Sequence, residues 1–300
     1  MINLIITIGL TTLLYLIFKA FGRFSINTFQ AVVFNYITCV FVGSFFSFDT
    51  DLQPMLENST WFYLSFFMGA LFISAFYLMA WSAQKISVTV STVSSKMSMI
   101  LPVLFSFLYL KIELSNLLLY IIGLLLALVS IFLSTKKPYS TEKSDSYLKF
   151  AILIFLLTGA VDTSVNLANA KFGAIPHFSQ LFPVTVFAMA SVFGLSLLGF
   201  KILKRKEVFS FRNLLAGVVL GIPNYFSIYF LMRSLDDFQG NGAFVFPIMS
   251  ISVIVFSSLL AWFLFKEKLH PVNILGIVCA VFAIVIISYQ EMIGYLASTN

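Results

Sequence analysis

Two residues that can carry a charge lie deep inside long apolar stretches of the sequence. Lys96 lies within an apolar run at 88–109, and Asp162 lies within another at 148–170. A charge at the centre of a membrane helix costs about 2.5–3.5 kcal/mol even on a lenient insertion scale. We therefore expect both to have a function: Lys96 could bind an anionic group of a substrate, such as a carboxylate, and Asp162 could take up a proton and couple transport to it. An ion pair that only packs two helices together is an equally good interpretation.

Small polar side chains surround both charges and extend the candidate site. In the run at 148–170, Asn166 and Asn169 share one helical face with Asp162. In the run at 88–109, Ser95 precedes Lys96 on a helix with a wide polar face. A polar face of this kind should look into protein or a water-filled cavity, because lipid offers it no hydrogen-bond partners. The two amides could also simply join helices by hydrogen bonds, as amides often do in membrane bundles.

Two tyrosines and several prolines add weaker signals. Tyr77 and Tyr229 occupy corresponding positions in two apolar runs, so the pair could form aromatic walls of a substrate site. Aromatic residues make up 17% of the chain, and ordinary packing is therefore the alternative interpretation for each tyrosine. Four prolines interrupt predicted helices and free backbone carbonyls, a feature that transporters use at ion sites and hinges, although proline kinks are also common where nothing binds. They are Pro102, Pro183, Pro223 and Pro247.

The composition indicates that the elements carrying these residues lie in a membrane. Of the 300 residues, 60% are hydrophobic and only 10% are charged, whereas a soluble domain is roughly one quarter charged. A spanning helix needs about 20 mostly apolar residues, and the chain contains ten such stretches. We predict transmembrane helices at 2–20, 29–47, 61–81, 88–109, 114–134, 148–170, 177–199, 212–233, 243–265 and 272–288.

The polar stretch 135–147 divides these ten helices into two halves of similar length. A shift of about 150 residues aligns Gly69 with Gly221 and Tyr77 with Tyr229, and other matches keep the same order. We predict a five-helix repeat at 1–134, a polar linker at 135–147 and a second repeat at 148–300. An odd number of helices inverts the second repeat in the membrane. The predicted fold class is therefore an all-α integral membrane protein of ten transmembrane helices, built as two inverted five-helix repeats around a central cavity.

Loop charges agree with this inversion. The loop after the second predicted helix is acidic, and the equivalent loop after the seventh is basic. The acidic residues are Asp49, Asp51 and Glu57, and the basic residues are Lys201, Lys204, Arg205 and Lys206. By the positive-inside rule the basic loop faces the cytoplasm, so both termini are predicted to lie on the opposite side.

Each half closes with a similar pattern, at 110–123 and at 265–276: a helix ends near a glutamate, a tight turn follows, and the next helix has an early glycine. Together with the ten helices and the duplication, these patterns resemble the ten-helix EamA branch of the drug/metabolite transporter superfamily over nearly the whole chain. The first half has Ile112-Glu113 where that branch usually has Gly-Glu. Glu113 and Glu267 themselves are interpreted as turn and capping residues.

The resemblance implies a basket of helices around a central cavity, alternating access, and export of amino acids or other small metabolites. It does not identify the cargo, because one fold hosts many substrates. The resemblance also implies that both termini face the cytoplasm, contrary to the loop charges.

The leading hypothesis is therefore a secondary transporter in the plasma or inner membrane, with a small-molecule substrate and the lipid bilayer as partners. An intramembrane enzyme acting on a lipid or lipid-linked sugar would need clustered acids or histidines at a membrane face, and a non-transporting scaffold is the third alternative. No Gly-rich loop ends in Gly-Lys-Ser or Gly-Lys-Thr, so the chain has no site of its own for driving transport with ATP. We expect no catalytic residue, cofactor, metal or nucleic-acid partner. Oligomeric state, coupling ion and transport direction stay open.

Overall fold

The computed structural model describes residues 2–46, 59–108, 117–136, 141–172, 175, 177–238 and 242–298. Every regular element within these ranges is an α-helix, as the sequence predicts. The helices are α1 (Ile2–Arg23), α2 (Thr28–Phe46), α4 (Ser59–Lys85), α5 (Val88–Met97), α6 (Ile100–Leu108), α7 (Leu117–Thr135), α8 (Thr141–Phe172), α9 (Phe178–Leu203), α10 (Phe211–Asp237), α11 (Gly242–Phe265) and α12 (Pro271–Ser298).

Seven helices in the described part of the chain are long and apolar enough to cross a membrane, namely α1, α2, α4, α8, α9, α10 and α11. Shorter apolar segments lie within α7 and α12, at Ile121–Thr135 and Pro271–Ile286. Each of the ten predicted ranges contains helix where the structure describes it, with turns at residues 98–99 and at His177. The chain is therefore a multi-pass integral membrane protein, because so many apolar helices cannot be covered by water-soluble surface.

The largest difference from the sequence prediction lies in the run at 88–109, which is two helices rather than one. α5 ends at Met97 and α6 begins at Ile100. Pro102 explains the break, because a proline has no N–H to donate to the carbonyl four residues earlier and its ring collides with that carbonyl. The residue four positions earlier is Ser98, whose carbonyl instead accepts a hydrogen bond of 2.9 Å from the N–H of Leu101.

The predicted polar linker at 135–147 is also partly helical. α7 ends at Thr135, and α8 already begins at Thr141, so the second half of the linker extends a membrane helix beyond its apolar part. Charged residues are tolerated in such an extension because it lies outside the apolar span. Residues 137–140 lie outside the described part of the chain.

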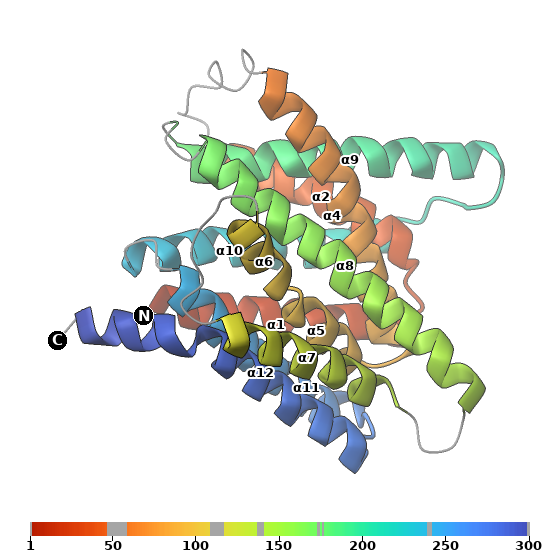
Figure 1. Cartoon of the computed structure of the whole chain (residues 1–300). Helices are drawn as coiled ribbons and strands as arrows, with labels where there is room; N and C mark the ends of the chain where they lie inside the picture. The colour runs from red at the N-terminus through yellow and green to blue at the C-terminus, as the bar shows by residue number, and fades with distance from the viewer. Residues whose placement is uncertain are drawn as a thin grey trace.

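α5 lies at the centre of the bundle. It contacts α1, α4, α7, α8, α11 and α12, although it has only 10 residues. Around this centre, α2 packs along both α9 and α10, and α7 lies beside α12 at the lower edge of the molecule in Figure 1. Helices from the two predicted halves are therefore interleaved rather than packed as two separate domains.

Glycines allow the closest contacts between these helices. A Cβ atom added to Gly69 on α4 would lie 2.7 Å from the backbone nitrogen of Ala190 on α9. A Cβ added to Gly221 on α10 would lie 2.7 Å from the carbonyl oxygen of Asn35 on α2. At both positions only glycine lets the two helix backbones approach so closely, a common solution where helices pack in lipid.

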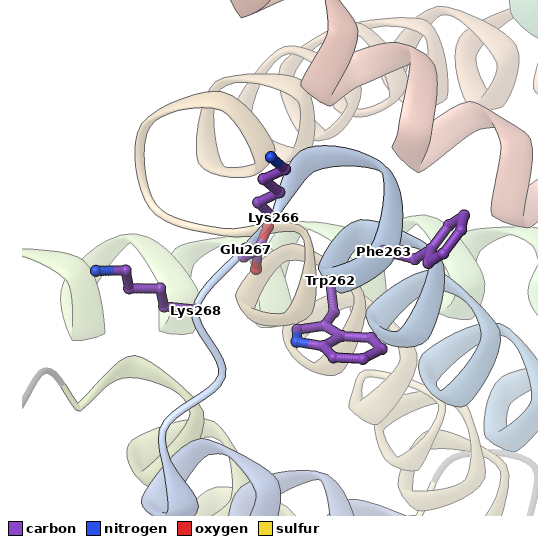
Figure 2. A pocket seen from close by; sticks show the side chains of 5 residues that line it. All are labelled: Trp262, Phe263, Lys266, Glu267 and Lys268. Atoms are coloured by element: carbon purple, nitrogen blue, oxygen red, sulfur yellow. The ribbon is translucent and has the colours of Figure 1, made fainter.

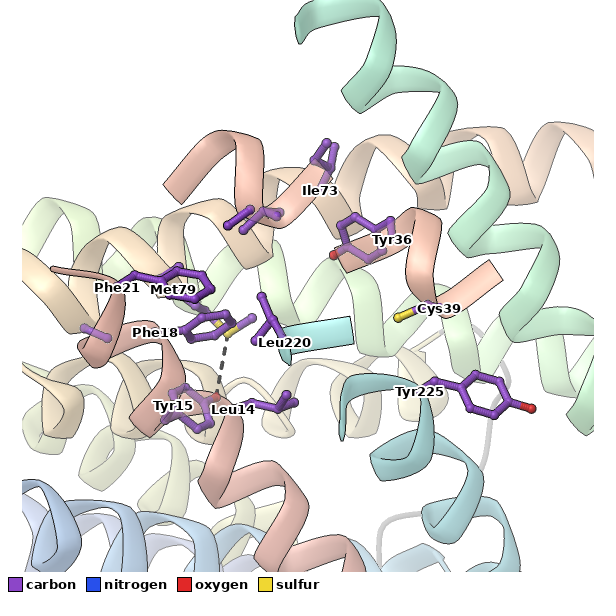
Figure 3. Close-up of a cluster of buried hydrophobic side chains, with 14 of the residues drawn as sticks. Leu14, Tyr15, Phe18, Phe21, Tyr36, Cys39, Ile73, Met79, Leu220 and Tyr225 are labelled. Atoms are coloured by element: carbon purple, nitrogen blue, oxygen red, sulfur yellow. Dashed lines mark hydrogen bonds between the residues drawn. The ribbon is translucent and has the colours of Figure 1, made fainter. Parts of the chain in front are cut away.

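The apolar core beside α5 includes a layer of aromatic side chains among its aliphatic residues. Figure 3 shows Tyr15 and Phe18 of α1 facing Met79 of α4, with Leu220 of α10 close by. The Phe18 ring meets the Phe76 ring edge-on at a centroid distance of 5.6 Å. This aromatic layer fixes the position of α1 against α4, on one side of α5.

Polar contacts join the chain segments at one end of the bundle, where α1, α4, α7, α9 and α11 finish; we call this the basic end. Gln30 is 1% exposed, and its amide nitrogen donates 2.8 Å to the carbonyl of Val208. The side-chain oxygen of Gln30 accepts a hydrogen bond of 2.9 Å from Asn213. The α1–α2 turn and the α9–α10 loop, which the sequence places on one side of the membrane, are thus bound to each other.

Candidate functional site

The candidate site is centred on Ser98, at the break between α5 and α6. Its hydroxyl lies 3.1 Å from the Asp162 Oδ2 atom on α8 and also within hydrogen-bond distance of the Ser95 carbonyl. The break places Ser98 beyond the last residue of α5, so its hydroxyl can reach across to α8. The structure therefore brings Ser95 and Asp162, predicted from separate apolar runs, to one place.

Tyr15 of α1 completes this cluster, although the sequence analysis did not single it out. Its phenol hydroxyl forms a hydrogen bond with the Ser95 hydroxyl and lies 3.7 Å from the Met79 sulfur. The Tyr15 side chain is 4% exposed. Because the chain has 12 tyrosines and is rich in aromatic residues, nothing in the sequence distinguishes Tyr15 as a site residue. Only the packing of α1 against α5 reveals it.

Asp162 has solvent-accessible surface despite its position in the middle of α8. One turn earlier, Thr158 is buried at 8% exposure, and three residues later Val165 packs against an aromatic core cluster. These neighbours share the helical face of Asp162 and face protein, whereas Leu156 on another face is 51% exposed. Asp162 therefore combines a hydrogen bond from Ser98 with surface that the described part of the bundle leaves uncovered.

Lys96 lies on α5 next to Ser95 and is half-buried. It interacts electrostatically with Asp162. Within the described part of the chain, however, no carboxylate lies within 4.0 Å of its ammonium group in a salt bridge, and no hydrogen bond from it is found. The described contacts thus place the two charges near each other without a direct ion pair.

The other predicted site residues lie farther from this cluster or fall outside the description. Asn166 is half-buried on α8 and has an interaction partner. Asn169 belongs to α8, but its side chain lies outside the described residues. Thr158 on the same face bonds to its own helix, with its hydroxyl 2.6 Å from the Ile154 carbonyl.

Tyr77 and Tyr229 do not meet in the structure. The Tyr77 ring packs edge-on against Phe29 at a centroid distance of 5.8 Å, and Tyr229 lies 6.4 Å from Phe46. Phe29 and Phe46 lie at opposite ends of α2, about 25 Å apart at 1.5 Å per residue. The Tyr229 hydroxyl also accepts a hydrogen bond of 3.2 Å from Arg233. The two tyrosines therefore occupy opposite ends of the bundle rather than two walls of one site.

The cluster offers an ammonium group, a carboxylate and three hydroxyls within the apolar part of the bundle. We call Tyr15, Ser95, Lys96, Ser98 and Asp162 the central cluster. These groups can bind a small molecule that carries both a negative and a positive or hydrogen-bonding group, and the carboxylate can also take up a proton. Among the residues that the structure describes, no three His, Cys, Asp or Glu side chains gather in a way that could hold a metal ion.

Comparisons with known proteins bear on the fold. No protein-family profile matches the chain. An uncharacterized protein of Haemophilus influenzae is 28% identical to it over 299 residues, covering 97% of this chain and 99% of that protein. A solved crystal structure of a protein superimposes with a TM-score of 0.62 at 16% sequence identity, covering 96% of this chain and 97% of the other. The chain is therefore a multi-pass helical membrane protein with a full-length relative in Haemophilus influenzae and a fold that recurs in a solved protein.

Proposed function

We propose that this protein is a secondary transporter of small polar metabolites that works by alternating access, as a member of the ten-helix EamA branch of the drug/metabolite transporters. The observation that carries the proposal is the central cluster. A membrane helix breaks between α5 and α6, and the break lies beside Asp162 and begins two residues after Lys96. Discontinuous helices with ionisable residues near the middle of the membrane are how transporters build substrate and ion sites.

The pairing of the helices supports an inverted repeat, the architecture on which many transporters base alternating access. If each helix of the first half corresponds to one of the second, α1 matches α8, α2 matches α9, and α4 matches α10. Exchanging the halves converts the α2–α10 contact into the α9–α4 contact, and the α1–α10 contact into the α8–α4 contact. All four contacts are present.

Exchanging the two halves also exchanges the two close-packed glycines, Gly69 and Gly221. Gly69 brings α4 against α9, and Gly221 brings α10 against α2. The shift of about 150 residues that aligns the halves pairs these two glycines with each other. Equivalent residues at equivalent interfaces are the expectation for a duplicated unit, and two such units can exchange conformations to open either side of the membrane.

In the proposed cycle, Lys96 binds the anionic group of the substrate. Asp162 binds its cationic group or takes up a proton, and Ser98 holds the Asp162 carboxylate in position. The absence of a direct Lys96–Asp162 salt bridge among the described contacts leaves both groups available to a ligand. Export of amino acids or related compounds is the direction and cargo that the family resemblance suggests.

A transport assay on the purified protein in liposomes tests the proposal. A panel of amino acids, nucleosides and sugars first identifies a substrate. Lys96→Met/Asp162→Asn, which removes both charges and so strands neither, is then expected to fold and to lose transport by about tenfold or more, the effect of about 1.4 kcal/mol. Lys201→Met is the matched control, because it removes an ammonium group from the Lys201–Glu207 pair at the basic end. Full transport by the folded double variant would contradict the proposed site.

A further inference from the structure

Glu267, in the turn between α11 and α12, joins three elements at the basic end. Its Oε2 atom lies 3.6 Å from the Lys19 ammonium on α1 and accepts a hydrogen bond of 3.1 Å from the backbone N–H of Val88, the first residue of α5. The Glu267 side chain is only 8% exposed. Lys266 and Lys268 on either side are exposed and point in different directions (Figure 2). The carboxylate of the turn thus binds the end of one helix and the start of another.

The same two helices meet again in the central cluster. Lys19 follows Tyr15 by one turn of α1, and Tyr15 bonds to Ser95 of α5. On α5, Val88 and Ser95 are separated by about 10 Å at 1.5 Å per residue. α1 and α5 are therefore bridged at two levels, once in the central cluster and once at the basic end. If α1 and α5 move apart at the basic end, the hydrogen bond between Tyr15 and Ser95 is strained as well.

Only one of the two carboxylate oxygens of Glu267 has a partner among the described residues. Its Oε1 atom is buried and has no hydrogen-bond partner among the described residues. A buried polar atom without a partner destabilises the closed arrangement, and the atom regains hydrogen bonds when water reaches it. The free energy of closing is thereby kept small, which suits a contact that opens and closes repeatedly.

We propose that Glu267, together with Lys19 and the N–H of Val88, forms a latch that holds the basic end of the bundle closed and opens in each transport cycle. The inference rests on the proposed function, since a latch is needed only if the two ends open in turn. We call the line of contact between α1 and α5 the α1–α5 seam. In this proposal the α11–α12 turn controls whether solvent and substrate can enter the bundle along that seam from the basic end. Because Tyr15 and Ser95 lie on the same seam, ligand binding in the central cluster changes the strain on the latch.

Accessibility of a cysteine on the seam measures the latch directly. Thr92 is buried on α5 between Val88 and Ser95, and its hydroxyl bonds only to carbonyls of its own helix. We would place Thr92→Cys in a background with Cys39→Ser and Cys279→Ser, and apply an impermeant maleimide to each face of membrane vesicles. Glu267→Gln and Lys19→Met are each expected to speed labelling from the basic end about tenfold, a shift equivalent to about 1.4 kcal/mol.

Glu207→Gln is the matched control. It removes the Lys201–Glu207 pair, with an N···O distance of 3.2 Å, and weakens the 3.2 Å hydrogen bond that Glu207 accepts from Gln30 of α2; both contacts lie at the same end but involve neither α1 nor α5. Labelling of Glu267→Gln that is as slow as that of Glu207→Gln would overturn the latch. If Glu267→Gln does not fold, Lys19→Met decides, because it leaves the bond to Val88 intact. The labelling assay contains no substrate, so its result stands apart from the liposome assay that tests transport.

Discussion

The Ser98 hydroxyl belongs to the candidate site, and its proposed role can be tested by a single substitution. It lies between the end of α5 and the Asp162 carboxylate, and it reaches that carboxylate because the helix breaks there. Hydrogen bonds to charged groups contribute about 1.5–3 kcal/mol. Ser98 therefore fixes the direction of the Asp162 carboxylate without itself carrying a charge.

We expect Ser98→Ala to lower transport by about tenfold, because the loss of a hydrogen bond to a charged group is worth at least about 1.4 kcal/mol. Initial transport rates in liposomes at equal protein content measure the effect. Ser130→Ala is the control, since Ser130 is buried and its hydroxyl bonds only to a carbonyl of its own helix, that of Ala127. Equal rates for the two variants would contradict the assigned role of Ser98.

The two charged residues of the site could be predicted from sequence, because an ionisable group inside an apolar run is conspicuous. The contact between Tyr15 and Ser95 could not, because it joins residues 80 positions apart and depends on how α1 crosses α5. Tyr77 and Tyr229 illustrate the opposite error. Their matching positions in the two halves suggested proximity, but the two rings pack against opposite ends of α2, as the proposed inverted repeat would lead one to expect.

Among the elements, α5 has the most unusual environment. It is the shortest helix but one in the described part of the chain, with 10 residues, and it contacts six other helices. Several of its buried side chains are hydroxyls, and those of Thr89 and Ser94 have no partner among the described residues. The apolar side chains of α5 are buried in the core, so its unpaired hydroxyls and the break at its end are the features that set it apart from the other helices.

Pro102→Ala tests the importance of the break. The new residue supplies an N–H that can bond to the Ser98 carbonyl, so α5 and α6 should join into one continuous helix. We expect transport to be lost while the melting temperature in detergent stays the same or rises. Pro183→Ala serves as the comparison, because α9 continues through Pro183 without interruption. Normal transport by Pro102→Ala would show that the break is dispensable.

The helix ranges were predictable because hydropathy reports the length of apolar runs directly. The interruption at Pro102 was visible in sequence, but its division of the run into two helices was not, since a proline within a membrane helix can either kink or divide the helix. The start of α8 inside the predicted linker was missed for a related reason. Polarity marks where a segment leaves the lipid, but it does not mark where the helix ends.

At the scale of the whole molecule, the basic end is held together by contacts between distant segments. Gln30 binds the α9–α10 loop, Glu267 binds α1 and α5, and Asn273 donates to the Ser134 carbonyl at the end of α7 over 2.9 Å. The loops that the sequence assigned to one side of the membrane by charge therefore contact one another. Which side that is depends on the positive-inside rule alone.

We predict that the basic end faces the cytoplasm and that both termini lie outside it. With the native cysteines replaced, Lys204→Cys should be protected from an impermeant thiol reagent in intact cells, whereas Asp237→Cys at the end of α10 should react. Both positions are exposed in the structure, so access from the solvent is equal and only sidedness differs. The reverse labelling pattern would mean that the loop charges are misleading and that the orientation implied by the family resemblance holds.

The hydrogen bonds that Gln30 forms at the basic end also bear on the order in which the protein folds during its synthesis. The amide of Gln30 finds its partners at Val208 and Asn213, about 180 residues later in the chain. During translation α2 therefore enters the membrane long before the loop that satisfies its polar end, or the helices α9 and α10 that cover its sides, has been synthesised. A ribosome that stalls after the first half leaves α2 without α9 and α10, the two helices that it contacts most. The final packing of α2 must therefore wait until the second half has been made.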